Sequence, residues 1–316
     1  MGIIALSLLL YRLNKSYRRV SDVLVGTVFE PSKDIVLITG GVTGLGRELA
    51  IAFREKGATV VVWDIRYPEE DLKLDNVFYY QCDVSDRREV LKLSKAVREQ
   101  VGVVTILINN AGYTKGKSLL ELSHDEIERT IKVNLLSSFY TIKAFLPEML
   151  KAKRGYIITI GSVLGYISPA RLSAYGASKS GLVALHESLT YELGPPSLNQ
   201  SGVKTLLICP GQMQTRMFNG VITPSSLVAP LLDPTYVANY IVGAVELGRR
   251  GEIKIPFYGN FLPIIRAAPW PIVELARGMS GIDASMRKFV GAISASNSQQ
   301  ASLLGHDTNS LESVVN

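Results

Sequence analysis

Residues 34–50, DIVLITGGVTGLGRELA, decide the fold of this chain because they join an apolar strand to a helix through a glycine-rich turn. The run 35–39 is apolar and β-branched, and the segment that begins at Arg47 has the periodicity of a helix. Between them, Gly40, Gly44 and Gly46 let backbone N–H groups approach a phosphate at the positive end of the helix dipole. This context predicts a pyrophosphate-binding turn that also contains Leu45.

Apolar, β-rich runs alternate with amphipathic helical stretches along the rest of the chain. The runs cover residues 35–39, 59–63, 77–80, 104–109, 156–160 and 203–208, and residues 253–256 are a candidate for one more. Continuous apolar strands separated by helices indicate a parallel sheet covered on both faces. We therefore predict an α/β, doubly wound parallel sheet of the Rossmann type in a single domain, with its ligand at the carboxyl ends of the strands.

The composition is that of a globular protein, with 47% hydrophobic and 20% charged residues. We expect a catalytic domain over residues 33–256, an apolar, proline-rich C-terminal arm over residues 257–293 and a disordered tail over residues 294–316. The composition of the arm is compatible with a lid over the substrate, a second membrane contact or a packed extension. Cys82 and Cys209 lie in apolar stretches, which indicates buried thiols rather than a disulfide. The three histidines are far apart in the sequence, so we predict no metal site.

The net charge of +6 is unevenly distributed, because Arg12, Lys15, Arg18 and Arg19 closely follow the apolar run 2–11. That run is about half of the roughly 20 residues that span a bilayer, and a signal peptide would carry its positive charges before the apolar residues. We therefore predict that residues 1–32 include a shallow anchor at a membrane surface. The alternative is a short helix that packs on the fold or on a second subunit. Nucleic acid is not an expected partner, since the basic cluster lacks interleaved aromatic residues.

Two acidic residues follow the second and third predicted strands. Asp64 comes 18 residues after Gly46, where an acidic side chain accepts hydrogen bonds from the adenosine ribose. The same carboxylate repels a 2′-phosphate, so NAD is expected rather than NADP, although Arg66 can weaken this preference. Asp83 is a candidate neighbour of the adenine, or alternatively a cap of the next helix.

Four motifs occur in order at successive strand ends: TGGVTGLG at 39–46, NNAG at 109–112, YGASK at 175–179 and PG at 210–211. Together they resemble the TGxxxGxG, NNAG, YxxxK and PG motifs of the short-chain dehydrogenase/reductase family, and the resemblance covers residues 33–255. It implies an oxidoreductase that uses a nicotinamide cofactor. Residues that match the family's cofactor path are Asn110, Ala111, Gly112, Pro210 and Gly211.

Tyr175 and Lys179 are four residues apart on a predicted helix and therefore share a face. A phenol with a pKa near 10 is a poor base at neutral pH unless its anion is stabilised. The Lys179 ammonium and the positive charge of an oxidised nicotinamide both favour tyrosinate. Tyr175 then takes a proton from an alcohol, or gives one to a carbonyl oxygen. The alternative is a packing tyrosine beside a surface lysine.

The resemblance assigns further roles. Ser162, at the end of the fifth strand, matches the hydroxyl that holds the substrate oxygen. Asn134 matches the asparagine that completes a proton relay through water and Lys179, with a purely structural role as the alternative. Lys179, with Tyr175 beside it, also matches the lysine at the nicotinamide ribose, and Thr215 matches the threonine that holds the carboxamide.

The loop after the sixth strand, residues 216–235, is apolar and nearly uncharged, which suits a lipid-like ligand. VVVWDI, LDPTYVANYIVGAV and GMSGIDASMRKFVG resemble the retinol and 17β-hydroxysteroid dehydrogenase branch. That branch implies attachment to the cytosolic face of the endoplasmic reticulum or to lipid droplets. Members of the family often form dimers or tetramers, so a homodimer is one candidate assembly. We expect an NAD-dependent enzyme that interconverts a hydrophobic lipid-, sterol- or retinoid-like alcohol and its carbonyl. The alternatives are an NADPH-dependent keto-lipid reductase and a non-catalytic dinucleotide-binding membrane scaffold.

Overall fold

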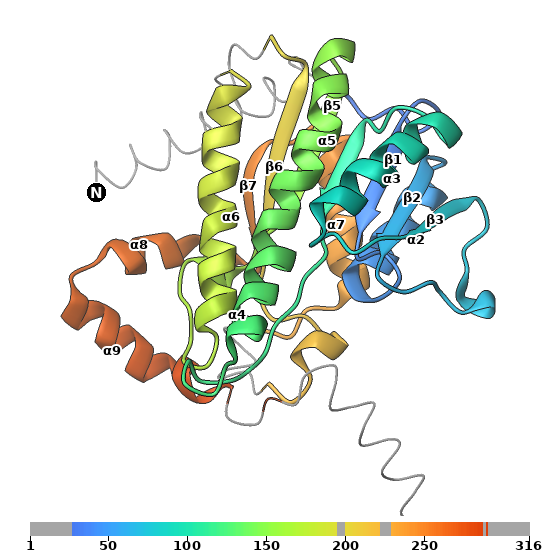
Figure 1. Cartoon of the computed structure of the whole chain (residues 1–316). Helices are drawn as coiled ribbons and strands as arrows, with labels where there is room; N and C mark the ends of the chain where they lie inside the picture. The colour runs from blue at the N-terminus through green and yellow to red at the C-terminus, as the bar shows by residue number, and fades with distance from the viewer. Residues whose placement is uncertain (1–26, 195–199, 222–228, 287–288, 290–316) are drawn as a thin grey trace, which may run out of the picture.

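The computed structural model describes residues 27–194, 200–221, 229–286 and 289. Its strands are β1 (Ile35–Thr39), β2 (Thr59–Asp64), β3 (Val77–Gln81), β4 (Ile106–Asn109), β5 (Gly155–Ile160), β6 (Val203–Pro210) and β7 (Gly251–Ile255). They form one parallel sheet in the order β3-β2-β1-β4-β5-β6-β7. The helices around it are α2 (Gly44–Glu55), α3 (Arg87–Gln100), α4 (His124–Ile131), α5 (Ser137–Ala152), α6 (Ser173–Glu192), α7 (Pro234–Glu246), α8 (Leu262–Ala267) and α9 (Trp270–Ser280) (Figure 1).

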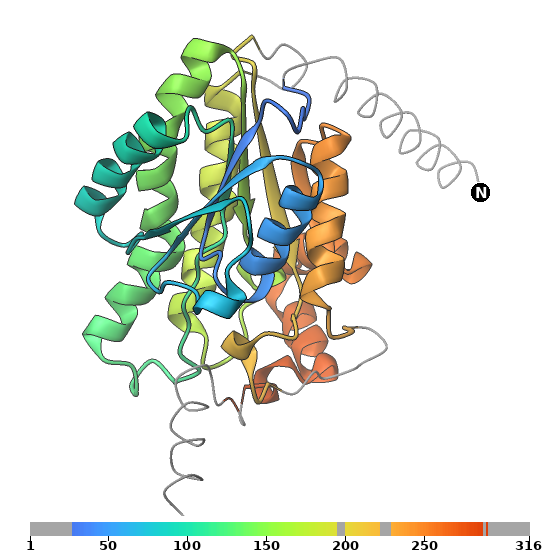
Figure 2. The same ribbon diagram turned by 90° about the vertical axis from the view of Figure 1, so that its right-hand side faces the viewer.

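Helices cover both faces of the sheet, because successive side chains of each central strand are buried on opposite sides. Val36 and Ile38 of β1 pack with α2 and α7, whereas Leu37 packs with the residues of α3, α5 and α6. Figure 2 shows the blue α2 and orange α7 on one side of the sheet and α3 and α5 on the other. The two layers explain why the central strands are continuous apolar runs, and they confirm the doubly wound fold.

The strand order reverses between β1 and β4, which is the point where a crevice opens outside the carboxyl ends of the strands. From β1 the chain winds outward through β2 to β3, and it then returns to the other side of β1 with β4. Only a short turn, η1 (Glu70–Leu72), lies between β2 and β3. The fold therefore brings the residues that follow β1, β2, β4, β5 and β6 to one edge.

Four shorter segments lie at this edge of the sheet or beside it. A π-helical turn, η2 (Lys132–Leu136), separates α4 from α5, and η3 (Val163–Gly165) follows β5. The turn η4 (Arg216–Phe218) follows β6, and η5 (Phe257–Phe261) leads from β7 into α8. The helix α4 begins with a capping box, in which Ser123 and Glu126 bond each other's backbone N–H groups.

The C-terminal arm of the sequence prediction is described up to Met286, together with Phe289. It consists of η5, α8, α9 and η6 (Ile282–Ala284), and it projects beside the start of α6 (Figure 1). Residues 1–26 of the predicted anchor segment 1–32 and the predicted tail at residues 294–316 lie outside the described residues. Among the helices that the structure does describe, none has the length and apolar character needed to cross a membrane.

Candidate active site

The glycine turn after β1 is held tightly against its neighbours. The Gly40 N–H donates to the Trp63 carbonyl (2.6 Å), and Gly40 has φ +64°, a conformation that L side chains rarely adopt. A Cβ atom on Gly46 would lie 2.1 Å from the Gly40 carbonyl oxygen, so only glycine permits this approach of α2. Thr43 makes no side-chain cap on α2, whose first turn also contains no acid. The N–H groups of that turn are thus suited to a phosphate, which fits the dinucleotide expected from the sequence.

Asn110 and Thr39 hold the turn from the side of β4. The Thr39 hydroxyl accepts hydrogen bonds from the N–H groups of Asn110 and Ala111, both at 3.0 Å. The Asn110 amide donates to the carbonyls of Thr39 (2.9 Å) and Gly40 (3.0 Å). Asn110 therefore positions the glycine turn. Thr39 was not among the residues predicted from the sequence, although a threonine at the end of a buried strand is a signal for such a contact.

Asp64 ends β2 beside the glycine turn and is 8% exposed. Its two carboxylate oxygens accept hydrogen bonds from the backbone N–H groups of Val42 (3.1 Å) and Arg66 (3.2 Å). Asp83 also lines the cavity, but one of its oxygens accepts from the Ser85 N–H (2.9 Å) and hydroxyl (2.7 Å). The cap of α3 is Asp86, whose side chain accepts from the first turn, so Asp83 is not the capping residue.

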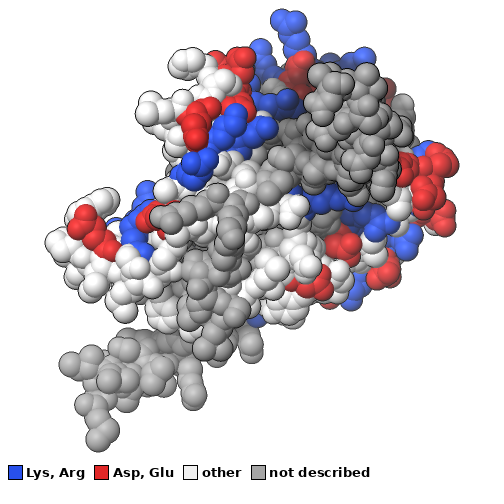
Figure 3. Space-filling model, turned by 90° about the horizontal axis from the view of Figure 1, so that it is seen from below, with Lys and Arg blue, Asp and Glu red and all other residues white. Residues whose placement is uncertain are grey.

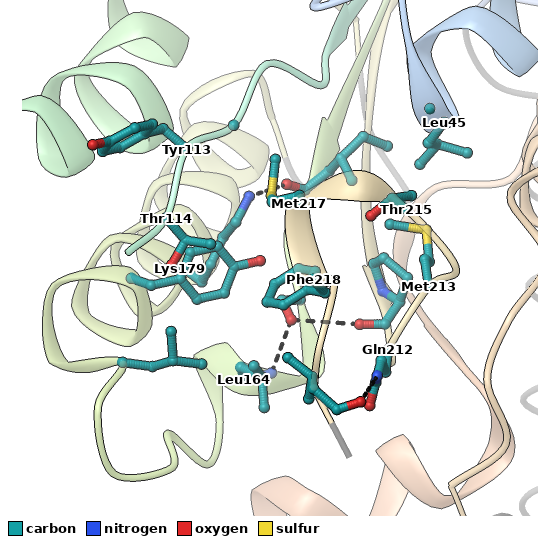
Figure 4. Close-up of a pocket in the computed structure, with 18 of the residues that line it drawn as sticks. Leu45, Tyr113, Thr114, Leu164, Lys179, Gln212, Met213, Thr215, Met217 and Phe218 are labelled. Atoms are coloured by element: carbon teal, nitrogen blue, oxygen red, sulfur yellow. Dashed lines mark hydrogen bonds between the residues drawn. The ribbon is translucent and has the colours of Figure 1, made fainter. Parts of the chain in front are cut away.

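Lys179 lies on α6 and is buried against the end of β5. Its ammonium donates to the Ile160 carbonyl (2.8 Å) and lies 5.6 Å from the centre of the Tyr175 ring. Burial lowers the pKa of Lys179 to about 8, so the side chain is mainly charged at neutral pH. Figure 4 shows Lys179 in one pocket with Met213, Thr215 and Phe218 of the loop after β6.

Tyr175 is buried at the wall of the same cavity, where its ring packs edge-on against Phe218 with centroids 5.7 Å apart. Burial raises the pKa of Tyr175, and a hydrogen bond to Ser162 opposes this rise. Ser162 in turn accepts a hydrogen bond from the Leu164 N–H (3.1 Å). Tyr175 is therefore a neutral phenol at neutral pH, with the Ser162 hydroxyl as its hydrogen-bond partner. That Ser162 holds the substrate oxygen stays a prediction.

Asn134 lies in the π-helical turn η2 and is 2% exposed. Its Oδ1 accepts from the Tyr113 N–H (2.7 Å), and its Nδ2 donates to the Tyr113 carbonyl (2.8 Å) and to the Ser178 hydroxyl (3.0 Å). The Ser178 hydroxyl donates to the Tyr175 carbonyl (2.6 Å). Asn134 therefore joins the segment after β4 to the helix that carries Tyr175, and its role in a relay to Lys179 stays a prediction.

The segment after β6 covers the glycine turn. The Gly211 N–H donates to the Ile255 carbonyl (2.6 Å), and a Cβ atom on Gly211 would lie 3.0 Å from Pro256. A Cβ atom on Gly44 would lie 3.6 Å from the Thr215 methyl group, which places Thr215 opposite the start of α2. All the residues predicted to bind the cofactor, apart from the tightly packed Gly46, line one cavity: Gly40, Gly44, Leu45, Asp64, Asp83, Asn110, Ala111, Gly112, Tyr175, Lys179, Pro210, Gly211 and Thr215.

That cavity has a volume of about 1740 Å³, and its end beyond Tyr175 is apolar. Leu172, Tyr175 and Met286 form a buried cluster there, against which Phe218 and Phe289 pack. The C-terminal arm supplies further lining residues, among them Phe261, Leu262, Ile265, Ala276 and Met279. From the sequence, the apolar pocket was predicted in the loop after β6, of which residues 222–228 are outside the described part. Met286 and Phe289 were not predicted as part of the pocket.

The comparisons with known proteins agree with this geometry. The short chain dehydrogenase family profile matches residues 34–224, and the chain belongs to the short-chain dehydrogenase/reductase family. A crystal structure of a short-chain dehydrogenase from Streptomyces avermitilis matches with a TM-score of 0.64 and 23% identity, over 78% of this chain and 98% of that one, which supports the fold. The protein is therefore a short-chain oxidoreductase with a nicotinamide cofactor.

Curated relatives indicate the branch of the family. An uncharacterized oxidoreductase of Saccharomyces cerevisiae, YDL114W, is 39% identical over 78% of this chain and 82% of its own length. Epidermal retinol dehydrogenase 2 of Mus musculus is 37% identical over 82% of this chain and 87% of its own. Human retinol dehydrogenase 10 is 37% identical over 67% of this chain and 71% of its own length. The chain groups with the retinol dehydrogenase branch, as the sequence motifs indicated.

Proposed function

We propose that this protein is an NAD(H)-dependent dehydrogenase that interconverts a hydrophobic alcohol and its carbonyl. The observation that carries the proposal is the shape of the cavity, which runs from the glycine turn past Tyr175 to an apolar end lined by the C-terminal arm. A pocket of this composition selects a ligand that is mainly hydrocarbon, with one polar group at the reacting end. The relatives named retinol dehydrogenase support a substrate of this kind.

Asp64 supports NAD(H) over NADP(H). Its carboxylate is held in place by the N–H groups of Val42 and Arg66, next to the turn that suits the pyrophosphate. Ribose hydroxyls donate to a carboxylate, whereas a 2′-phosphate at the same place brings two negative charges together.

In this proposal a bound nicotinamide would supply or accept the hydride at the substrate carbon, and the chain's own side chains handle the proton. The Ser162 hydroxyl orients the substrate oxygen against Tyr175. In reduction the neutral Tyr175 gives its proton to that oxygen, and the Lys179 ammonium favours the tyrosinate that remains. In oxidation the proton moves in the opposite direction. The apolar wall beyond Phe218 excludes water from the reacting atoms.

A second candidate is an NADPH-dependent reductase of a keto-lipid. It is favoured by Arg47 and Arg66, which line the cavity at the same end as Asp64 and suit a 2′-phosphate. Both candidates use the same catalytic groups, and they differ in the cofactor that the protein binds. We also propose that the chain acts at a membrane or lipid-droplet surface on the cytosolic side, through the N-terminal anchor predicted from the sequence.

A series of straight-chain alcohols of increasing length, oxidised with NAD⁺, tests the proposed substrate class. Each methylene group buried in the cavity contributes about 0.8 kcal/mol, so kcat/KM is expected to rise roughly fourfold per added carbon until the apolar end is filled. Tyr175→Phe, assayed with the best substrate, is the control for turnover at this site. Rates that stay constant or fall with chain length would contradict a hydrocarbon-binding cavity.

A further inference from the structure

The outer face of the C-terminal arm carries large apolar side chains that the rest of the described chain leaves uncovered. Ile264 on α8 is 68% exposed, and Leu275 and Met279 on α9 are 64% and 81% exposed. Ile272, half exposed, is on the same side of α9 as Leu275 and Met279, since these positions lie within about 60° of one another around a helix. We call these four residues the apolar face of the arm. Viewed from below, the arm is mostly white, with few charged side chains (Figure 3).

Three polar contacts fix which side of the arm faces outward. Arg266 of α8 donates to the Gly165 carbonyl (2.8 Å), and Arg277 of α9 donates to the Ser168 carbonyl (3.0 Å). Asp283 accepts from the Ala170 N–H (2.9 Å) and forms an ion pair with Arg277. All three contacts involve the segment between Ser162 and Tyr175. We call this segment, residues 163–174, the catalytic loop. The arm is thus attached to the catalytic loop by its charged side chains, and its apolar face points away from the rest of the domain.

The apolar face is continuous with the cavity. Met279 belongs to both, since it is largely exposed and also lines the cavity, and Phe261 is half exposed and lines the cavity as well. Ile265 of α8 lines the cavity too, and so does Ala276, which is next to Met279 around α9. A hydrocarbon chain can therefore pass from the apolar face to the apolar end of the cavity over apolar side chains.

We propose that the apolar face of the arm docks on the hydrocarbon of a lipid layer, so that the substrate enters the cavity from the lipid without crossing water. This rests on the proposed function, which supplies the hydrophobic substrate. Met279 is both exposed and part of the cavity wall, so it marks an opening of the cavity on the apolar face. A lipid layer fits this face better than a protein does, because a protein bound over Met279 would cover the opening, whereas fluid lipid leaves it accessible to the substrate. The charged side chains of α8, α9 and η6 agree, since none of them belongs to the apolar face. Arg266, Arg277 and Asp283 contact the segment that precedes Tyr175, and Glu274 accepts a hydrogen bond from the Trp270 indole N–H (2.9 Å). Exposed apolar helices of this kind lie shallowly in the interface.

The two tryptophans of the chain make a direct test feasible, because Trp63 is buried and Trp270 lies in the arm. In full-length protein carrying Trp270→Phe, Leu275→Trp places a reporter on the apolar face. The matched control is Leu91→Trp, at a 45% exposed position on α3, on the other flank of the molecule (Figure 1). Each variant is mixed with phosphatidylcholine vesicles with and without brominated lipid, and tryptophan emission is measured alongside flotation of the vesicles.

Brominated lipid is expected to quench the Leu275→Trp emission at least twofold more than the Leu91→Trp emission. Flotation with equal, weak quenching of both reporters would overturn the inference, because another segment would then hold the protein on the vesicle. An absence of flotation would overturn the inference as well. A third contrary result is Leu275→Trp emission that is already shielded from an aqueous quencher without lipid, because a second copy of the chain would then cover the face. The measurement needs no turnover, so its failure is distinct from a failure of the alcohol-oxidation assay.

Discussion

Asn134→Ala is expected to destabilise the fold as well as to impair the reaction. The side chain makes three hydrogen bonds, with the Tyr113 N–H, the Tyr113 carbonyl and the Ser178 hydroxyl, and it is almost fully buried. A typical intramolecular hydrogen bond contributes about 1 kcal/mol to stability, and a buried group left without a partner costs more. We therefore expect the free energy of unfolding to fall by about 3 kcal/mol, with a drop in Tm of roughly 5–10 °C.

Urea unfolding followed by far-ultraviolet circular dichroism measures this change, with Asn219→Ala as the control at an exposed asparagine of the same cavity. The control is expected to stay within about 0.5 kcal/mol of the unmodified protein. If Asn134→Ala also stays within that range but loses activity, the three hydrogen bonds do not support the fold. Asn134 would then act in proton transfer alone, and a stabilising role of its side chain in the fold would be refuted.

Three further changes probe the turn and the catalytic pair. Tyr175→Phe is expected to lower kcat by about 10²–10⁴, while NADH fluorescence titration shows a Kd that rises no more than about tenfold, the cost of one lost hydrogen bond. A near-normal kcat would remove the tyrosine from the mechanism. Gly46→Ala places a Cβ 2.1 Å from the Gly40 carbonyl oxygen and is expected to weaken NADH binding at least tenfold by titration calorimetry. The control Gly243→Ala on α7, where nothing lies within 4 Å, is expected to leave NADH binding unchanged and the fold equally or slightly more stable. Equal affinities of the two variants for NADH would contradict the close packing at Gly46. Burial lowers the pKa of Lys179 from 10.5 to about 8, so the folded protein binds fewer protons than the unfolded chain between these values and its stability rises with pH there. Relative to Lys179→Met, the free energy of unfolding of the unmodified protein in urea is therefore expected to rise by up to about 3 kcal/mol as the pH increases from 8 to 10.5. A difference in free energy between the two proteins that stays constant with pH would mean that the lysine is not desolvated.

The sheet was predictable because each central strand is covered on both faces and so appears in the sequence as a continuous apolar run. The predicted runs 35–39 and 59–63 agree with β1 and β2 to within one residue, and 104–109 contains β4. The strand β3 is only partly buried, yet its aromatic residues indicated it. The glycine turn was equally predictable, because a glycine-rich turn between a strand and a helix is determined by residues that are close together in the sequence.

Other features could not be predicted because they depend on contacts between distant segments, and the spacing of residues along the chain gives no information about such contacts. The π-helical turn around Asn134 has the same apolar pattern as an ordinary helix, and the partner of Asn134 is backbone some 20 residues earlier, at Tyr113. The attachment of Arg266 and Arg277 to the catalytic loop likewise joins residues about 100 apart. The apolar composition of the arm indicated a lid, a membrane contact or a packed extension. Only the folded arrangement places one side of it on the cavity and leaves the other exposed.

The central claim is a dehydrogenase site selective for NAD(H), and paired titrations with NADH and NADPH, followed by nicotinamide fluorescence, test it most directly. Two negative charges about 5 Å apart at a protein surface repel by about 3 kcal/mol, so NADH is expected to bind roughly 100-fold more tightly than NADPH. Asp64→Ala is expected to abolish or reverse this preference, while Asp83→Ala, which removes the other carboxylate at this end of the cavity, leaves it in place. A preference for NADPH in the unmodified protein would contradict the account and favour the keto-lipid reductase, and binding of neither cofactor would contradict a functional oxidoreductase site.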